Sequence, residues 1–95
     1  MTKKDIKELP NFIDTNDIIK LTDFLDKYHV NYKIVENSVE TDTVKLYDRG
    51  ITQLPDSIGH LTCNELFLNN NNLTQLPDNI VNLKCKHLLI RLVQI

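Results

Sequence analysis

Two cysteines and three histidines are the side chains of this sequence best suited to bind a metal ion or to act as nucleophiles. Cys85 and His87 stand two residues apart, and Cys63 precedes Cys85 by 22 positions. Thiolate sulfur and imidazole nitrogen are both ligands of Zn²⁺. A Cys63/Cys85/His87 metal cluster is therefore one interpretation, and a Cys63–Cys85 disulfide is another.

The alternation of side chains along a strand argues against the metal cluster. If Cys85 points into a core together with Leu88, then His87 projects to the opposite, solvated face. The other two histidines, His29 and His60, have no His, Cys or acidic partner at the spacing of a zinc site. We therefore expect no metal and no cofactor, and we predict that both cysteines are buried free thiols that pack as small apolar side chains.

Catalytic motifs built on glycine-rich turns are missing from the sequence. The chain has two glycines, Gly50 and Gly59, and neither belongs to a phosphate-binding loop or a nucleophile elbow. No paired catalytic carboxylates stand out either. We therefore expect a non-enzymatic protein.

Composition narrows the classes of partner. The 95 residues carry a net charge of −2 with well-mixed signs and no basic run, which disfavours nucleic acid as a partner. No apolar run approaches the roughly 20 residues of a membrane span, so no membrane association is expected. Charged residues, not an apolar segment, follow Met1, which predicts a cytoplasmic protein with reduced thiols.

A 22-residue period organises the second half of the chain. Leu54-Pro55 and Leu76-Pro77 stand 22 positions apart, as do Leu46 and Leu68. A fixed period with apolar residues at fixed offsets is typical of units that stack because one unit alone cannot bury its apolar face. Leu66 and Leu68 stand two residues apart and are flanked by the polar Glu65 and Asn69, which predicts a short strand in each unit.

The motif Cys63-x-x-Leu66-x-Leu68-x-x-Asn71-x-Leu73-x-x-Leu76-Pro77-x-x-Ile80-x-x-Leu83 resembles the leucine-rich repeat family of the Leu-Pro-x-x-Ile type. The resemblance covers residues 41–95. It implies an α/β fold that is a short right-handed solenoid of two full repeats and the start of a third. It also implies that the Asn71 side chain bonds the backbone of adjacent turns, although Arg49 and Val93 occupy the equivalent positions.

Residues 1–40 are predicted to form an N-terminal cap that folds as one unit with the repeats. Apolar residues at three- and four-residue steps predict an amphipathic helix at about 15–29, with Asp14 as its N-cap. A strand is expected at about 32–36. The cap would cover the apolar cross-section that the first repeat otherwise exposes.

The neighbours of the inward strand residues should line a concave strand face in columns. A mixture of aromatic, apolar and Arg side chains on such a face is typical of a protein interface. Alternatively, the apolar members are covered by the chain ends, or Lys45 and Glu65 form a cross-strand charge pair. The predicted partner-binding residues are Lys45, Tyr47, Glu65, Phe67, Asn69, His87, Leu89 and Arg91, with Thr43 completing the first column.

The third repeat has a strand but lacks the Leu-Pro-x-x-Ile return after it. An uncovered strand edge tends to pair with another chain, so Leu92, Val93 and Ile95 are predicted to mediate self-association or partner contact. The leading functional hypothesis is a protein-interaction module, with a small inhibitor of a larger protein as one form of it. The alternative is a structural subunit that forms a homo-oligomer through this end.

Overall fold

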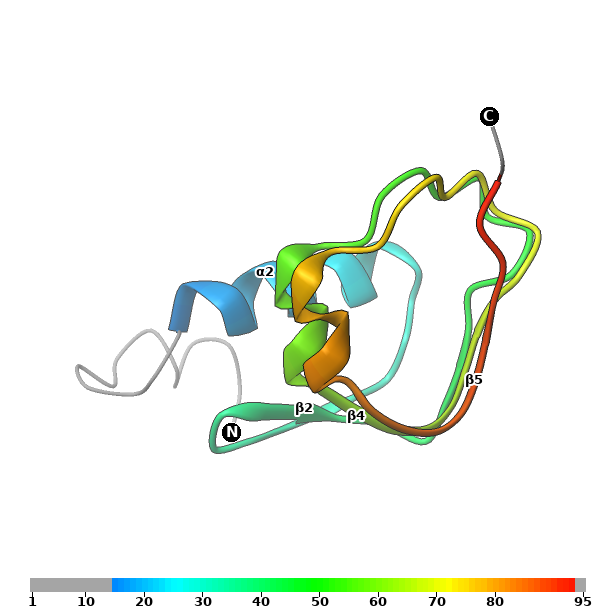
Figure 1. Ribbon diagram of the computed structural model, residues 1–95. Helices are drawn as coiled ribbons and strands as arrows, with labels where there is room; N and C mark the ends of the chain where they lie inside the picture. The colour runs from blue at the N-terminus through cyan, green and yellow to red at the C-terminus, as the bar shows by residue number, and fades with distance from the viewer. Residues whose placement is uncertain (1–14, 94–95) are drawn as a thin grey trace.

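The computed structural model describes residues 15–93 of the chain (Figure 1). One helix, five strands and two short 3-10 helices follow one another in this part. In chain order they are α2 (Thr15–Lys27), β1 (Lys33–Val35), β2 (Ser38–Glu40), β3 (Thr43–Lys45), η1 (Asp56–His60), β4 (Leu61–Leu68), η2 (Asp78–Asn82) and β5 (Lys84–Ile90).

Helix α2 confirms the predicted N-terminal helix, although it ends at Lys27 and not at residue 29. Its apolar stripe places Ile18, Leu21 and Leu25 in the core. His29 follows with φ 59°, the left-handed conformation common at helix C-termini. The predicted N-cap, Asp14, lies outside the described residues.

Strands β1 and β2 form an antiparallel hairpin in which Ile34 lies opposite Val39. Strand β1 confirms the strand expected at about 32–36. Both apolar residues are buried, whereas their neighbours Val35 and Glu40 are exposed, as the two-residue period of a half-buried strand requires. Strand β2 then pairs parallel with the beginning of β4.

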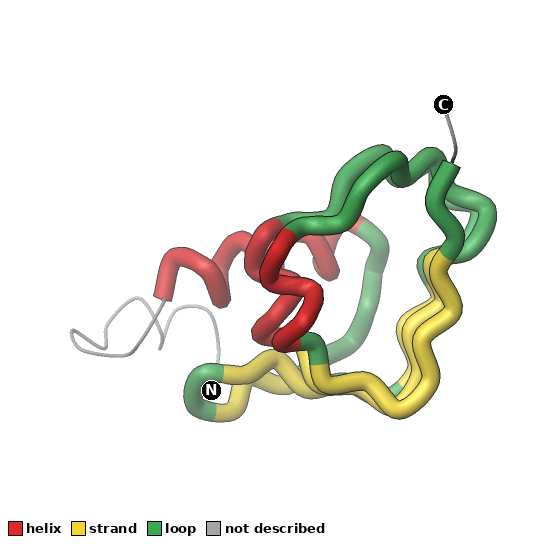
Figure 2. The backbone as a smooth tube through the Cα atoms, in the orientation of Figure 1, coloured by secondary structure: helices red, strands yellow, loops and turns green. Residues whose placement is uncertain are grey.

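Strand β4 lies between β3 and β5, and all three strands run parallel. Val44 pairs with Leu66, and Leu66 pairs with Leu88, so each strand is shifted by 22 residues from its neighbour. In Figure 2 the strands overlie one another along the bottom and right of the view, and the helical segments lie on the opposite side. The sequence period therefore sets the register of this parallel part.

The predicted right-handed leucine-rich-repeat solenoid is wrong as a fold class. The described residues form a small compact α/β structure with one helix and a mixed five-stranded sheet in the order β1-β2-β4-β3, with β5 added to β4. The physical reason is that the N-terminal hairpin joins the same sheet through β2, in an antiparallel pair that no 22-residue period generates. Helix α2 does cover the first unit, consistent with the predicted helical cap.

The core lies between the sheet and the helical segments. Helix α2 packs against η1, and η1 packs against η2, so the three lie in succession (Figure 1). Ile58 of η1 is buried between them, whereas η2 has no buried residue. The fully buried apolar residues are Ile18, Leu21, Leu25, Val39, Val44, Leu46, Ile58, Leu61, Leu66, Leu68 and Leu73.

Asn71 ties the two units together through its buried side chain. Its Oδ1 accepts hydrogen bonds from the backbone N–H of Arg49 and Ile51, each at 3.0 Å. Its Nδ2 donates to the backbone oxygens of Leu46 at 2.7 Å and Leu68 at 3.0 Å. These contacts confirm the role expected for Asn71, because a buried amide must find partners for both its donor and its acceptor atoms.

Candidate protein-binding surface

The outward residues of the three parallel strands lie in register columns. Lys45 pairs with Phe67, and Phe67 pairs with Leu89. The first column, which runs from Thr43 through Glu65 to His87, has the same arrangement, and Thr43 Oγ1 donates to Glu65 Oε1 at 3.2 Å. The columns follow from the parallel pairing with a constant offset.

The third column lies just beyond the ends of the strands. There the backbone N–H of Asp48 donates to the oxygen of Asn69 at 3.3 Å, which keeps the chain segments adjacent. Tyr47 is 43% exposed, and Arg91 is also exposed. Asn69 is half-buried.

Exposure differs among the predicted partner-binding residues. Leu89 is 51% exposed. Lys45 and His87 are exposed, whereas Glu65 and Phe67 are half-buried. We name the surface formed by Lys45, Tyr47, Phe67, Leu89 and Arg91 the strand face.

Strand β5 leaves apolar side chains in solvent at the edge of the sheet. Leu88 pairs with the buried Leu66 but is itself 42% exposed, so the core is less covered at β5 than at β4. Leu92 and Val93 are exposed as well, and Ile95 lies outside the described residues. Within residues 15–93, β5 pairs only with β4.

The two thiols lie side by side on β4 and β5. Cys63 and Cys85 are direct register partners, and their sulfur atoms are 3.4 Å apart. Burial, followed by the neighbouring Cys85, raises the pKa of Cys63 to about 12, because both effects disfavour the thiolate. Cys85 is half-buried, and its Sγ lies 3.1 Å from the backbone oxygen of His87.

The metal cluster considered from the sequence has no support in this geometry. Cys85 contacts the main chain of His87, whose side chain is exposed. Across residues 15–93, no group of three or more His, Cys, Asp or Glu side chains could hold a metal ion. Both cysteines are free thiols, as predicted, although Cys85 is only half-buried.

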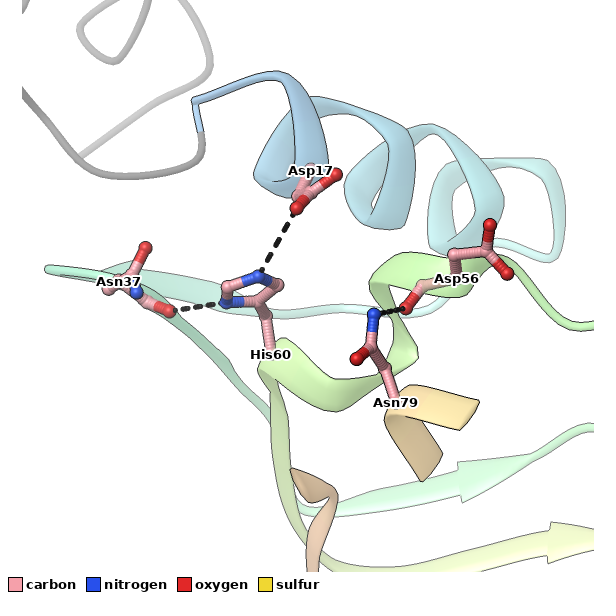
Figure 3. Close-up of polar contacts among 5 residues, drawn as sticks. All are labelled: Asp17, Asn37, Asp56, His60 and Asn79. Atoms are coloured by element: carbon pink, nitrogen blue, oxygen red, sulfur yellow. Dashed lines mark hydrogen bonds and ion pairs between the residues drawn. The ribbon is translucent and has the colours of Figure 1, made fainter. Parts of the chain in front are cut away.

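His60 makes two polar contacts that the sequence did not predict (Figure 3). Its Nδ1 lies 3.1 Å from the backbone oxygen of Asn37, and its Nε2 lies 3.7 Å from Asp17 Oδ2. The sequence analysis considered partners of His60 only at the spacing of a zinc site, whereas Asp17 comes close because the fold packs α2 on η1. The amphipathic pattern of the helix placed Asp17 on its polar face, but this pattern could not identify His60 as the partner.

A polar groove of about 720 Å³ surrounds this contact. Its walls come from α2, the β1–β2 hairpin, η1, η2 and the beginnings of β4 and β5. Asn79 Nδ2 donates to the backbone oxygen of Asp56 at 3.1 Å and joins η2 to η1 beside it (Figure 3). The imidazole of His60 contacts a carbonyl and a carboxylate, so it fastens the helix and the hairpin to η1.

The fold and the surface together define a small α/β chain with a mixed sheet, an apolar and aromatic strand face and an open sheet edge. No protein-family model, curated protein or solved structure matches this chain. No helix among the described residues 15–93 has the length and apolar character needed to cross a membrane.

Proposed function

We propose that this protein is a cytoplasmic, non-enzymatic interaction module that binds a partner protein through the strand face. The observation that carries the proposal is the register column in which Lys45, Phe67 and Leu89 stand side by side, with Leu89 51% exposed. Tyr47 and Arg91 extend the same surface beyond the strand ends.

The chemistry of this surface supports a protein partner. Aromatic residues and Arg are enriched among the residues that contribute most to binding energy, because they bury a large area and retain a polar group. Hydrogen bonds between the parallel strands hold the column in place, so little conformational entropy would be lost on binding. The leucine-rich-repeat resemblance of residues 41–95 is compatible with this role, and inhibition of a larger protein is one form it would take.

A pull-down from native lysate, followed by a titration against each captured protein, tests the proposal. Phe67→Ala should weaken partner binding by at least about tenfold, the loss typical of a central interface residue. Val81→Ala is the matched control, because Val81 is 83% exposed on η2, away from the strands. Equal binding by the wild type, Phe67→Ala and a Tyr47→Ala/Arg91→Ala double variant would refute the strand face as the site.

The edge of β5 favours a second candidate, which is self-association. Leu88, Leu92 and Val93 are all exposed next to this edge. An exposed edge strand with apolar side chains is prone to pair with another strand, and a charged residue there opposes the pairing. A structural subunit that forms a homo-oligomer through this end is therefore the alternative function.

Light scattering after size exclusion separates the two functions. Self-association predicts a mass that increases with concentration and returns to that of the monomer in Leu92→Lys. A monomeric mass at every concentration would exclude the homo-oligomer and leave partner binding untouched. Conversely, an oligomer that persists in Phe67→Ala but is lost in Leu92→Lys would assign the assembly to the β5 edge.

A further inference from the structure

Cys63 and Cys85 have the backbone placement that an intramolecular disulfide needs. They are direct partners on adjacent parallel strands. Neighbouring strands lie about 4.8 Å apart, which is within the Cα separation of about 4.4–6.8 Å that disulfides adopt. The sulfur atoms are 3.4 Å apart and must approach to about 2.0 Å. Rotation of the two side chains supplies this shift while the strands remain paired.

A small reagent can reach Cys85 from solvent, because this thiol is only half-buried. A surface depression of about 450 Å³ is lined by both cysteines. Lys84 and Lys86 lie on its rim, with Glu40 as the acidic residue there. The two ammonium groups outnumber the carboxylate, so the local potential favours an anionic reagent.

We propose that Cys63 and Cys85 form a redox-active dithiol that a low-molecular-weight disulfide of the glutathione class converts into an intramolecular disulfide. The site is separate from the strand face and does not depend on the function proposed above. Oxidised glutathione would react with the two free thiols of the reduced protein whenever it accumulates.

The reaction proceeds by two thiol–disulfide exchanges. Cys85, the more exposed thiol, releases its proton and attacks one sulfur of oxidised glutathione. The glutathione S–S bond breaks, one glutathione leaves and takes up a proton, and a mixed disulfide remains on Cys85. Cys63 then releases its proton and attacks the Cys85 sulfur, which displaces the second glutathione. In total two protein thiols are oxidised, and one glutathione disulfide is reduced to two thiols.

The environment of the two sulfurs predicts which exchange is slow. Cys63 is buried, and its pKa is raised to about 12, so little thiolate is present near neutral pH. Proximity compensates, because the attacked sulfur lies on the adjacent strand. The closing step should therefore accelerate as the pH rises from 7 to 9.

The disulfide would join the sheet edge covalently to its centre. Strand β5 pairs with β4 alone within the described residues and has no buried residue, so it can be released without breaking any other strand pair. A cross-link between positions 63 and 85 would restrict this release, because it limits the conformations available to the opened segment. Oxidation would thus stabilise the strand that carries Leu89 of the strand face.

Intact-mass spectrometry after incubation with oxidised glutathione tests the proposal. The wild type should lose two hydrogens without gaining glutathione, and dithiothreitol should reverse the change. Cys63→Ser should stop at the mixed disulfide, and Cys85→Ser should react at least about tenfold more slowly, since its remaining thiol is buried. Proteolytic peptide mapping should recover one peptide pair linked through Cys63 and Cys85.

The wild type alone decides the question if a serine variant does not fold, which circular dichroism reveals. A stable mixed disulfide on the wild type, an intermolecular dimer on a non-reducing gel, or two unreacted thiols would each overturn the proposal. Hydrogen exchange gives an independent measurement. The amides of β5 should exchange roughly a hundredfold more slowly in the oxidised protein, and unchanged exchange would refute the predicted effect on the strand.

Discussion

Strands β4 and β5 have similar sequences but different surroundings. Strand β4 is paired on both sides, and Leu66 on it is fully buried. Strand β5 is paired on one side within the described residues, and its equivalent residue, Leu88, is 42% exposed. The 3-10 helices differ in the same way, because η1 is covered by both α2 and η2, whereas η2 has no buried residue.

The comparison separates what local sequence determines from what neighbours determine. Pro55 and Pro77, which precede η1 and η2, have nearly the same backbone angles, with φ −66° at both and ψ 147° and 152°. The backbone is therefore nearly the same at these two positions. Burial is not repeated, because it depends on whether another strand or helix covers the segment.

The largest expected effect is on core packing. Leu66→Ala should reduce the free energy of unfolding by about 3–4 kcal/mol, because it leaves a cavity in a closed core. Leu88→Ala should cost only about 1 kcal/mol, since much of its side chain is already in water. Urea denaturation of both variants measures the difference. Equal losses would show that Leu88 is covered in solution, as an oligomer would cover it.

The next expected effect concerns the hydrogen bonds of Asn71. Asn71→Ala should cost about 2–3 kcal/mol, because it leaves the backbone groups of Arg49, Ile51 and Leu46 without their side-chain partner. The exposed neighbour variant Asn72→Ala should stay within about 0.5 kcal/mol. Chemical denaturation of the two variants side by side is the measurement. A harmless Asn71→Ala would mean that water replaces these bonds.

A smaller effect is expected where η2 lies close against η1. A Cβ atom on Gly59 would lie 2.7 Å from the backbone oxygen of Asn79, so Gly59→Ala should cost about 1–2 kcal/mol. Val81 occupies the equivalent position 22 residues later and is 83% exposed. Val81→Ala should therefore leave the melting temperature nearly unchanged. A stabilising Gly59→Ala would indicate that η2 moves away freely.

The smallest effect is the pH dependence of the paired thiols. The pKa of Cys63 rises from 9.0 to about 12 in the folded protein, so the folded state binds this proton more tightly than the unfolded state. The resulting stabilisation is complete below pH 9 and is lost progressively as the pH rises from 9 towards 12. Urea midpoints between pH 8 and 10 should therefore fall more steeply in the wild type than in Cys63→Ala. Parallel slopes would contradict a buried thiol.

Much of the local structure was predictable from the sequence. The apolar steps of Ile18, Leu21 and Leu25 predicted helix α2, and the 22-residue period predicted the register of β4 and β5. The fold class was not predictable in the same way, because the antiparallel β1–β2 hairpin follows no 22-residue period, although β2 itself pairs with β4 at that offset.

The candidate surface was likewise predictable in part. The constant offset was enough to place Lys45, Phe67 and Leu89 in one column. It was not enough to predict that Leu88 is exposed, since exposure depends on what covers β5. The contact between His60 and Asp17 also escaped prediction, because these residues are distant in sequence and meet only when α2 packs on η1.

The left-handed residues of the chain show where the backbone repetition stops. Asp48 and Asn70 occupy equivalent positions, and both have φ 57°. Short polar side chains tolerate this conformation, but Leu92, the next equivalent residue, is poorly suited to it and is not among the positive-φ residues. The N–H of Val93 bonds to the oxygen of Leu73 at 2.6 Å, one residue out of step with the earlier bond from Asn72 to Ile51. Because a leucine at position 92 does not favour the left-handed conformation, backbone chirality ends the repeated turn there.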